Sequence, residues 1–301
     1  MPRYSPAILL LILLNLIPVA TIGQVQVVVS IKPLQLIAES LLGDGGTVTT
    51  LLPGDRSPHH YSITPADRFA IADAKLVIYT GEELETQLHS ILERVKPAEQ
   101  VLRLLSLENL ILLSLGEEQT AAGTTHSHGR YDPHVWLSPA NGGLIALAIA
   151  DRLGAADPEN AENYYDRARR LVAELALQES SWRQRLLQTA GQPYIVYHDA
   201  FSYFEGFFEL QHALSLVADP EVQPGIRQIL EVRSAIDQLQ PVCLLAEPFA
   251  NQATIDTMLD GYSLSVARLD ILGRNLTEGQ GYIQLLNSVI NQFYECFQAK
   301  P

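Results

Sequence analysis

Short runs of β-branched and other apolar residues alternate along the chain with stretches whose apolar residues recur at helical spacing. In the first third, the apolar runs predict strands at Val25–Ile31, Thr47–Pro53 and Lys75–Gly81. Helical spacing follows each run, and in "TPADRFAIADA" Thr64 is a candidate N-cap with Asp67 as a capping-box acid. Strands that alternate with helices predict a parallel sheet covered by helices on both faces.

The same alternation returns in the last third of the chain. It predicts strands at Tyr194–His198, His212–Ala218, Val242–Pro248 and Ser265–Gly273, with helical patterns between them. The tail Tyr282–Phe297 is amphipathic and predicts a closing helix. We therefore predict an α/β protein of two lobes, each with a mostly parallel sheet flanked by helices.

A polar and apolar pattern of about thirty residues, from Pro158 to Thr189, predicts one long helix between the two halves. Its recurring apolar positions are Tyr165, Ala168, Leu171, Leu175 and Trp182. About thirty helical residues span roughly 45 Å, more than a crossover inside one sheet needs. We predict a rigid helix at 156–190 that joins an N-terminal lobe at 24–155 to a C-terminal lobe at 191–301.

The first 23 residues have the order of a secretory signal peptide. Arg3 precedes an apolar run over Ala7–Ile17, and the small residues Ala20 and Gly23 follow. The apolar run is shorter than the about 20 residues that a membrane span needs. We therefore predict an exported protein that loses residues 1–23, and a retained N-terminal anchor is the alternative.

Residues 115–133 interrupt the alternation. They contain Gly, Thr and acidic residues without apolar periodicity, which predicts a mobile loop. The loop carries Glu117, Glu118, His126 and His128. A short histidine tract of this kind can bind metal weakly, and a polar loop without that role is the alternative.

The charge balance and the cysteines narrow the class of protein further. The formal net charge is −14, which argues against nucleic acid and against anionic membrane surfaces as partners.

The two cysteines, Cys243 and Cys296, both lie in the final quarter. In an exported protein they predict a disulfide between a core strand and the C-terminal helix, whereas in a reducing compartment they would be unrelated thiols.

Several histidines follow predicted strands, where ligands of parallel α/β sheets bind. His59 and His60 follow one strand, His198 ends another, and His134 comes directly after the loop. These segments come from both halves of the chain and could converge in a cleft between the lobes. Three imidazoles around one point suit a borderline metal such as zinc, although each histidine alone could be structural or merely exposed.

Other titratable residues are less distinctive. His89 and His212 have no supporting context, and we expect both to be structural. Glu247 and Asp270 end predicted strands and could face the same cleft, or cap the segments that follow. We expect Glu247 to orient a ligand, and we hold Asp270 as a possible fourth metal ligand or cleft carboxylate.

Seven separated motifs resemble, in family order, the zinc-binding solute-binding proteins of bacterial ABC transporters, the ZnuA type. They are "VVVSIKPL", "LLPGDRSPHHYSITPAD", "DPHVWLSP", "VYHDAFSYFE", "EVQPG", "LLAEP" and "LDILG". The resemblance implies that His59, His134 and His198 are the three histidine ligands and that His60 is an auxiliary neighbour. The position of Asp270 is where manganese-binding relatives use an aspartate. The two cysteines match positions that form a disulfide in some zinc-binding members.

The resemblance also implies a function. We expect a monomeric periplasmic protein, not an enzyme, that captures Zn²⁺ and hands it to the membrane permease of an ABC transporter. Manganese or iron as the bound metal is the nearest alternative. A zinc-dependent hydrolase is a more distant one, because three histidines and an open position also form a catalytic arrangement, yet no HExxH-like motif is present. A surface adhesin of the same fold is a further rival.

Overall fold

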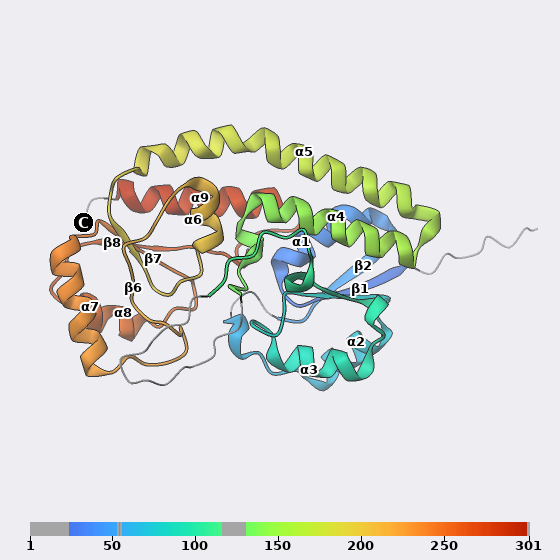
Figure 1. The fold of residues 1–301 in the computed structure, drawn as a ribbon, viewed down its shortest axis with the longest axis horizontal. Coiled ribbons are helices and arrows are strands. Elements are labelled where there is room, and N and C mark those ends of the chain that lie inside the picture. The colour runs from blue at the N-terminus through green and yellow to red at the C-terminus, as the bar shows by residue number, and fades with distance from the viewer. Residues whose placement is uncertain (1–23, 53, 55, 116–130, 300–301) are drawn as a thin grey trace, which may run out of the picture.

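Two four-stranded parallel sheets form the centres of two lobes (Figure 1). The computed structural model describes residues 24–52, 54, 56–115 and 131–299. The predicted signal peptide and most of the predicted loop lie outside these residues. Both sheets have the same order of strands, β2-β1-β3-β4 in the first lobe and β6-β5-β7-β8 in the second. This confirms the predicted fold of two parallel α/β lobes.

The N-terminal lobe follows the predicted alternation with one addition. Its strands are β1 (Val25–Val29), β2 (Gly46–Thr50), β3 (Leu76–Tyr79) and β4 (Val101–Arg103), and its helices are α1 (Lys32–Leu42), α2 (Pro65–Asp73) and α3 (Thr86–Val95). Strand β4 was not predicted, because three residues are too few to show a period. Helix α2 begins with the predicted capping box, in which Thr64 and Asp67 each accept a hydrogen bond from the other's backbone N–H.

The C-terminal lobe repeats the pattern with shorter strands. Its elements are β5 (Tyr194–Val196), α6 (Ser202–Phe208), β6 (Leu214–Ser215), α7 (Ile226–Leu239), β7 (Cys243–Ala246), α8 (Gln252–Leu259), β8 (Ser265–Arg268) and α9 (Tyr282–Gln298). All its strand pairs are parallel. The carboxyl ends of the strands in each lobe are therefore the edges from which loops can carry ligand-binding side chains.

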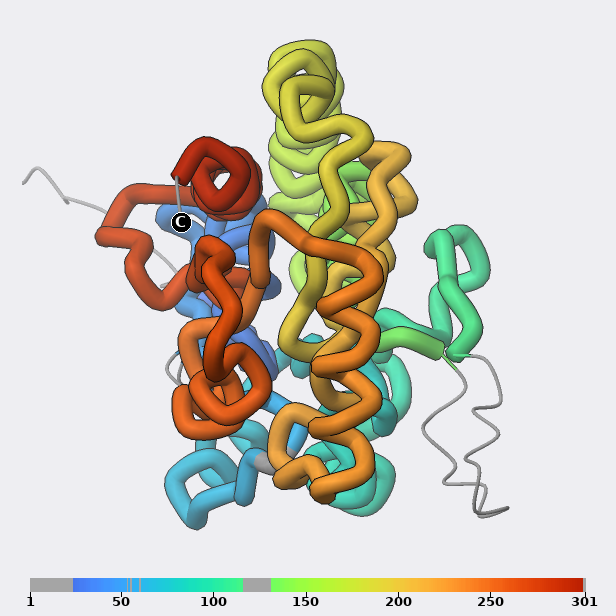
Figure 2. The backbone as a smooth tube through the Cα atoms, turned by 90° about the vertical axis from the view of Figure 1, so that its left-hand side faces the viewer, coloured from blue at the N-terminus to red at the C-terminus, as the bar shows by residue number. Residues whose placement is uncertain are grey.

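A long helix lies along both lobes, as predicted. Helix α5 (Ala161–Leu186) spans roughly 39 Å at 1.5 Å per residue. It packs against α4 (Pro139–Ala156) and α9, and Figure 2 shows it nearly end-on beside α9. Its buried face differs from the predicted one at one position, because Tyr164 is buried where Tyr165 was expected.

The largest hydrophobic core extends through both lobes. One cluster of buried residues joins the N-terminal sheet to α4, α5 and α9 and to one face of the C-terminal sheet. A second, smaller cluster fills the space between the opposite face of that sheet and helices α7 and α8. Since a core packed at crystal-like density resists sliding, we expect movement between the lobes to be small.

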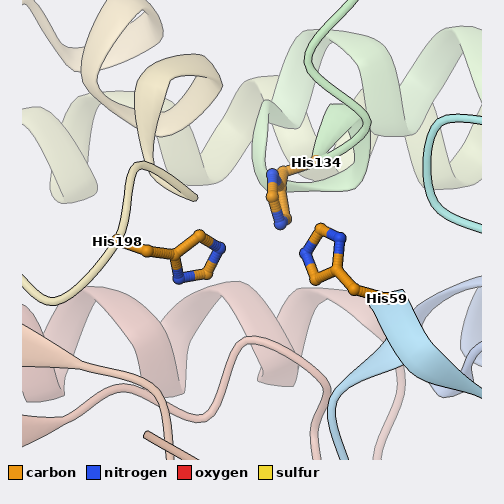
Figure 3. Close-up of side chains that lie close together, drawn as sticks. All are labelled: His59, His134 and His198. Atoms are coloured by element: carbon orange, nitrogen blue, oxygen red, sulfur yellow. The ribbon is translucent and has the colours of Figure 1, made fainter. Parts of the chain in front are cut away.

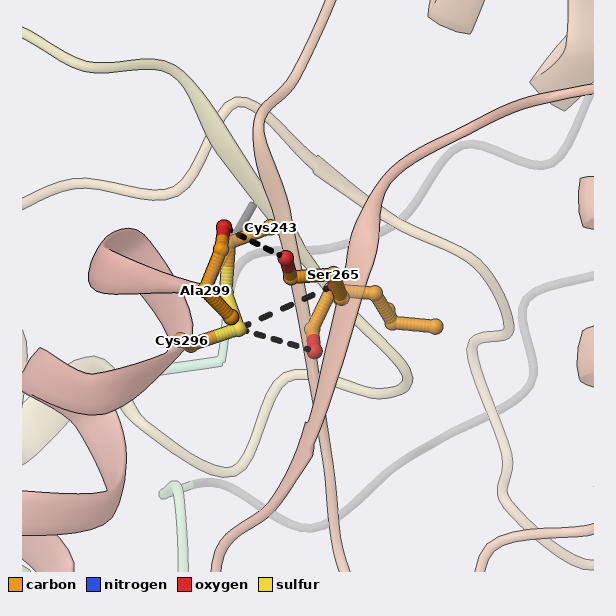
Figure 4. Close-up of a disulfide and its surroundings, with 5 residues drawn as sticks. Cys243, Ser265, Cys296 and Ala299 are labelled. Carbon is orange, nitrogen blue, oxygen red and sulfur yellow. Dashed lines mark hydrogen bonds between the residues drawn. A yellow bond between two sulfur atoms is a disulfide. The ribbon is translucent and has the colours of Figure 1, made fainter. Parts of the chain in front are cut away.

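A disulfide joins Cys243 on β7 to Cys296 on α9, as predicted (Figure 4). Next to it, the hydroxyl of Ser265 donates a hydrogen bond of 3.0 Å to the carbonyl of Ala299, just beyond α9. The C-terminal helix is therefore attached covalently to one strand and by a hydrogen bond to its neighbour. Among the described residues, no helix is long and apolar enough to cross a membrane.

Candidate metal centre

Three histidines from distant parts of the chain meet between the two lobes. His59 lies in a short 3-10 turn (Pro58–His60) after β2, and His198 lies two residues after β5. His134 immediately precedes a 3-10 turn (Val135–Leu137) that leads into α4. His59 and His198 therefore obey the rule that ligand-binding residues follow strands, whereas His134 is positioned by a turn before a helix.

The three imidazole rings face one another (Figure 3). Each offers one nitrogen, and these three atoms all lie within 4.8 Å of one another. The ring centroids are 5.5 Å apart for His59 and His134, 5.7 Å for His59 and His198, and 5.4 Å for His134 and His198. The predicted convergence of these residues is thus present. A small shift of each ring would place its nitrogen about 2.0–2.1 Å from a shared zinc ion, which is the length of a zinc–imidazole bond.

Asp132 fixes the ring of His134. The Nδ1 atom of His134 lies 2.7 Å from Oδ1 of Asp132, and the same oxygen accepts the backbone N–H of His134 at 2.9 Å. Both side chains are almost fully buried. Because a neutral histidine that donates from Nδ1 has an unprotonated Nε2, this contact prepares His134 to bind a metal through Nε2.

Glu247 holds His198 in the same manner. Its carboxylate pairs with Nδ1 of His198, and Glu247 is fully buried at the carboxyl end of β7. Burial alone would lower the pKa of His198, but the negative charge of Glu247 and its hydrogen bond outweigh burial and raise that pKa above its usual value. The position agrees with the expectation that Glu247 orients a ligand.

Asp270 is buried, and its carboxylate contacts the backbone of the turn that follows β8. One oxygen accepts the N–H of Arg274 at 2.8 Å, and the other accepts the N–H of Asn275 at 2.7 Å. Among the described residues, the group of possible ligands within 4.8 Å of one another contains the three histidines and not Asp270. In this structure Asp270 therefore stabilises the turn that follows β8.

The other histidines lie apart from this centre or outside the described residues. His89 contacts Tyr79, with Nδ1 2.8 Å from the phenol oxygen, and two surface glutamates. His212 contacts Glu205 at 2.9 Å. These contacts agree with the structural role expected for both residues. The side chain of His60 and all of His126 and His128 lie outside the described residues.

Sequence reasoning did not identify Asp132. A signal was present, because "DPH" places a carboxylate two residues before a predicted ligand, close enough for a local hydrogen bond. The structure therefore supplies two carboxylate–histidine pairs, one for His134 and one for His198. Imidazoles held in this way suit a borderline divalent metal, since the second nitrogen of each ring is oriented for binding.

Known proteins resemble this chain over most of its length. A family model described as "Zinc-uptake complex component A periplasmic" matches residues 27–296. The high-affinity zinc uptake system protein ZnuA of Yersinia pestis is 31% identical over 294 residues, covering 92% of each chain.

Solved structures share the fold at lower sequence identity. A crystal structure of ZnuA superposes with a TM-score of 0.75 and 21% identity, over 91% of this chain and 99% of that chain. The laminin-binding protein Lmb of Streptococcus agalactiae, described as a bifunctional protein with adhesin and metal transporting activity, superposes with a TM-score of 0.74 and 22% identity. That match covers 91% of this chain and 99% of the other.

Proposed function

The chain belongs to the family of periplasmic zinc-uptake components, and we propose that it captures zinc between its lobes and delivers the ion to the membrane permease of an ABC transporter. Proteins of this family bind zinc for transport and are not enzymes, which sets aside the hydrolase alternative. The observation that carries the proposal is the convergence of three imidazole nitrogens within 4.8 Å.

In this proposal His59, His134 and His198 are the zinc ligands. Zinc favours tetrahedral sites, so a fourth position remains, and we assign it to water or another oxygen ligand. Asp270 remains the alternative for that position, because each of its oxygens accepts one backbone N–H and keeps a further lone pair. Glu247 and Asp132 orient the ligands His198 and His134, because each carboxylate contacts the imidazole nitrogen that faces away from the proposed ion.

The ligand set is the argument for zinc over manganese. Imidazole nitrogens suit zinc, whereas manganese favours carboxylate, carbonyl and water oxygens. The three-histidine group contains no carboxylate among the described residues. We therefore expect zinc to displace manganese from the protein at equal concentrations.

Metal binding by the mature chain tests the proposal directly. The apo-protein, beginning at residue 24, would be titrated with zinc and with manganese in the presence of a chromophoric chelator of known affinity. We expect one zinc per chain, and a loss of affinity of at least a hundredfold in His59→Ala, since removing one of three ligands leaves an incomplete site. His89→Ala is the matched control, because the His89 ring contacts Tyr79 and two glutamates and does not belong to the three-histidine group. Equal zinc affinity in His59→Ala and the wild type would refute the assignment.

Delivery to a permease and export by residues 1–23 need a test in cells. A strain of the native organism that lacks this gene would be complemented with the wild type, with His59→Ala and with a variant lacking residues 1–23. We expect radioactive zinc uptake to return only with the wild type, since the other two proteins cannot bind the ion or reach the periplasm. Uptake restored by either variant would contradict the proposed route. We also expect the protein to elute as a monomer with and without zinc.

A further inference from the structure

The connection that carries His198 into the centre also carries a buried tyrosine. Tyr203 comes five residues later, on α6, and only 2% of its surface is exposed. Its hydroxyl donates a hydrogen bond of 2.9 Å to the backbone carbonyl of Asp132 and accepts one of 2.9 Å from the N–H of Leu113. Burial raises the pKa of the Tyr203 phenol, so the hydroxyl keeps its proton and remains a donor.

These contacts reach the residue that orients His134. The N–H of Asp132 donates to the carbonyl of Leu113 at 2.9 Å, and Ser114 and Tyr131 form an antiparallel bridge beside that bond. Tyr203 therefore closes a small network in which two backbone segments, about twenty residues apart in sequence, are joined through one hydroxyl. The carboxylate of Asp132 extends from this network to Nδ1 of His134.

Two further hydrogen bonds attach the His134 segment to the C-terminal lobe. The indole N–H of Trp136 donates to the carbonyl of Ile271 at 3.0 Å, and the hydroxyl of Tyr282 donates to the carbonyl of Trp136. Chain order places this segment in the N-terminal lobe at 24–155, but besides its bond to Leu113 it has hydrogen bonds to α6, to α9 and to the turn after β8. The position of His134 thus depends in part on the same lobe that carries His198.

We propose that Tyr203 is a positioning residue for zinc capture, which holds the Asp132–His134 pair in register with His198. The inference rests on the proposed function. The connection from β5 into α6 would then position two of the three ligands. It carries His198 itself, and it holds His134 through the hydroxyl of Tyr203.

The Tyr203 hydroxyl serves two backbone groups at once, the carbonyl of buried Asp132 and the N–H of half-buried Leu113. Without it both groups lose this partner, and the Asp132 carbonyl loses it in a buried position that water does not readily reach. The peptide at Asp132 is then held only through its N–H and the neighbouring bridge, so its carboxylate is fixed less firmly against Nδ1 of His134. Residues that orient metal ligands in this way commonly change metal affinity by about ten- to a hundredfold.

Tyr203→Phe is the first variant to measure, because it removes one oxygen and keeps the packing of the ring. We expect the dissociation constant for zinc to rise about tenfold, mainly through faster release to an excess of chelator in stopped flow. Tyr164→Phe is the matched control: its hydroxyl is also bonded at 2.7 Å, to Asp157, and its ring is 1% exposed. If both variants lose the same stability but only Tyr203→Phe loses affinity, the effect is one of positioning. Equal zinc affinity in Tyr203→Phe and wild type overturns the inference.

A double-mutant cycle with Asp132→Ala tests the route of the effect. If Tyr203 acts through the Asp132 carboxylate, Tyr203→Phe will change zinc affinity little once that carboxylate is gone, so the two effects will not add. Fully additive effects would overturn the inference. A spectroscopic readout is independent of affinity: ¹⁵N-histidine spectra of the apo-protein should show one neutral tautomer at His134 in wild type and a mixture in Tyr203→Phe. A single unchanged tautomer in the variant counts against the proposal.

The design separates this inference from the proposed function. If the wild type binds no zinc, or if His59→Ala binds zinc as tightly as the wild type, the proposed function fails. The role of Tyr203 in zinc capture then fails with it. If the wild type binds zinc through the three histidines and Tyr203→Phe binds equally well, only the inference about Tyr203 fails.

Discussion

Glu85 is a buried carboxyl group that should make the stability of the protein depend on pH. It lies just before α3, is 5% exposed, and accepts the backbone N–H groups of Thr80 at 3.3 Å and Gly81 at 3.0 Å. Burial raises its pKa from 4.5 to about 7, although these hydrogen bonds act in the opposite direction. The perturbation that isolates this effect is Glu85→Gln, which keeps the shape of the side chain and cannot ionise.

The sign and size of the change in stability with pH follow from proton linkage. Between pH 4.5 and about 7 the folded protein holds a proton on Glu85 that the unfolded chain has lost. The free energy of unfolding therefore falls as the pH rises through this window. A pKa of about 7 against 4.5 corresponds to about 3 kcal/mol in total, of which about 2 kcal/mol lies between pH 5.5 and 8.5.

The assay is urea unfolding of the zinc-free protein, followed by tryptophan fluorescence between pH 5.5 and 8.5. This range stays above the isoelectric point near 4.9, so the protein remains negatively charged. We expect the stability of the wild type relative to Glu85→Gln to fall by about 2 kcal/mol across it. Glu174→Gln, an exposed position on α5, controls for the loss of one charge. A difference between wild type and Glu85→Gln that is independent of pH would refute the reasoning.

Two further predictions concern the metal centre and the C-terminal helix. Glu247→Gln should weaken zinc binding by about ten- to a hundredfold, because His198 loses the charged partner that orients it; chelator competition measures this, and unchanged affinity would show that the contact is dispensable. Replacing Cys243 and Cys296 together by serine should lower the free energy of unfolding by about 4 kcal/mol, since the cross-link closes a loop of 53 residues. Urea unfolding of the variant and of the reduced wild type should agree, and a variant as stable as the oxidised protein would contradict the estimate.

Local patterns in the sequence determined most of the architecture. The alternation of β-branched runs and helical periods specified two parallel sheets, because burial of both sheet faces requires apolar strands and amphipathic helices. The capping box at Thr64 and the length of α5 were also local properties, set by neighbouring residues. The convergence of His59, His134 and His198 followed partly from strand ends and partly from family resemblance.

Tertiary structure decided what each carboxylate does. Asp270 and Glu247 both follow strands in the sequence, yet one binds two backbone N–H groups and the other binds an imidazole. The role of Asp132, and the dependence of its peptide on Tyr203, involve groups 71 residues apart. A periodic pattern reports which face of an element is buried, whereas the partner of a buried polar atom is set by how distant elements pack, and that information exists only in the folded chain.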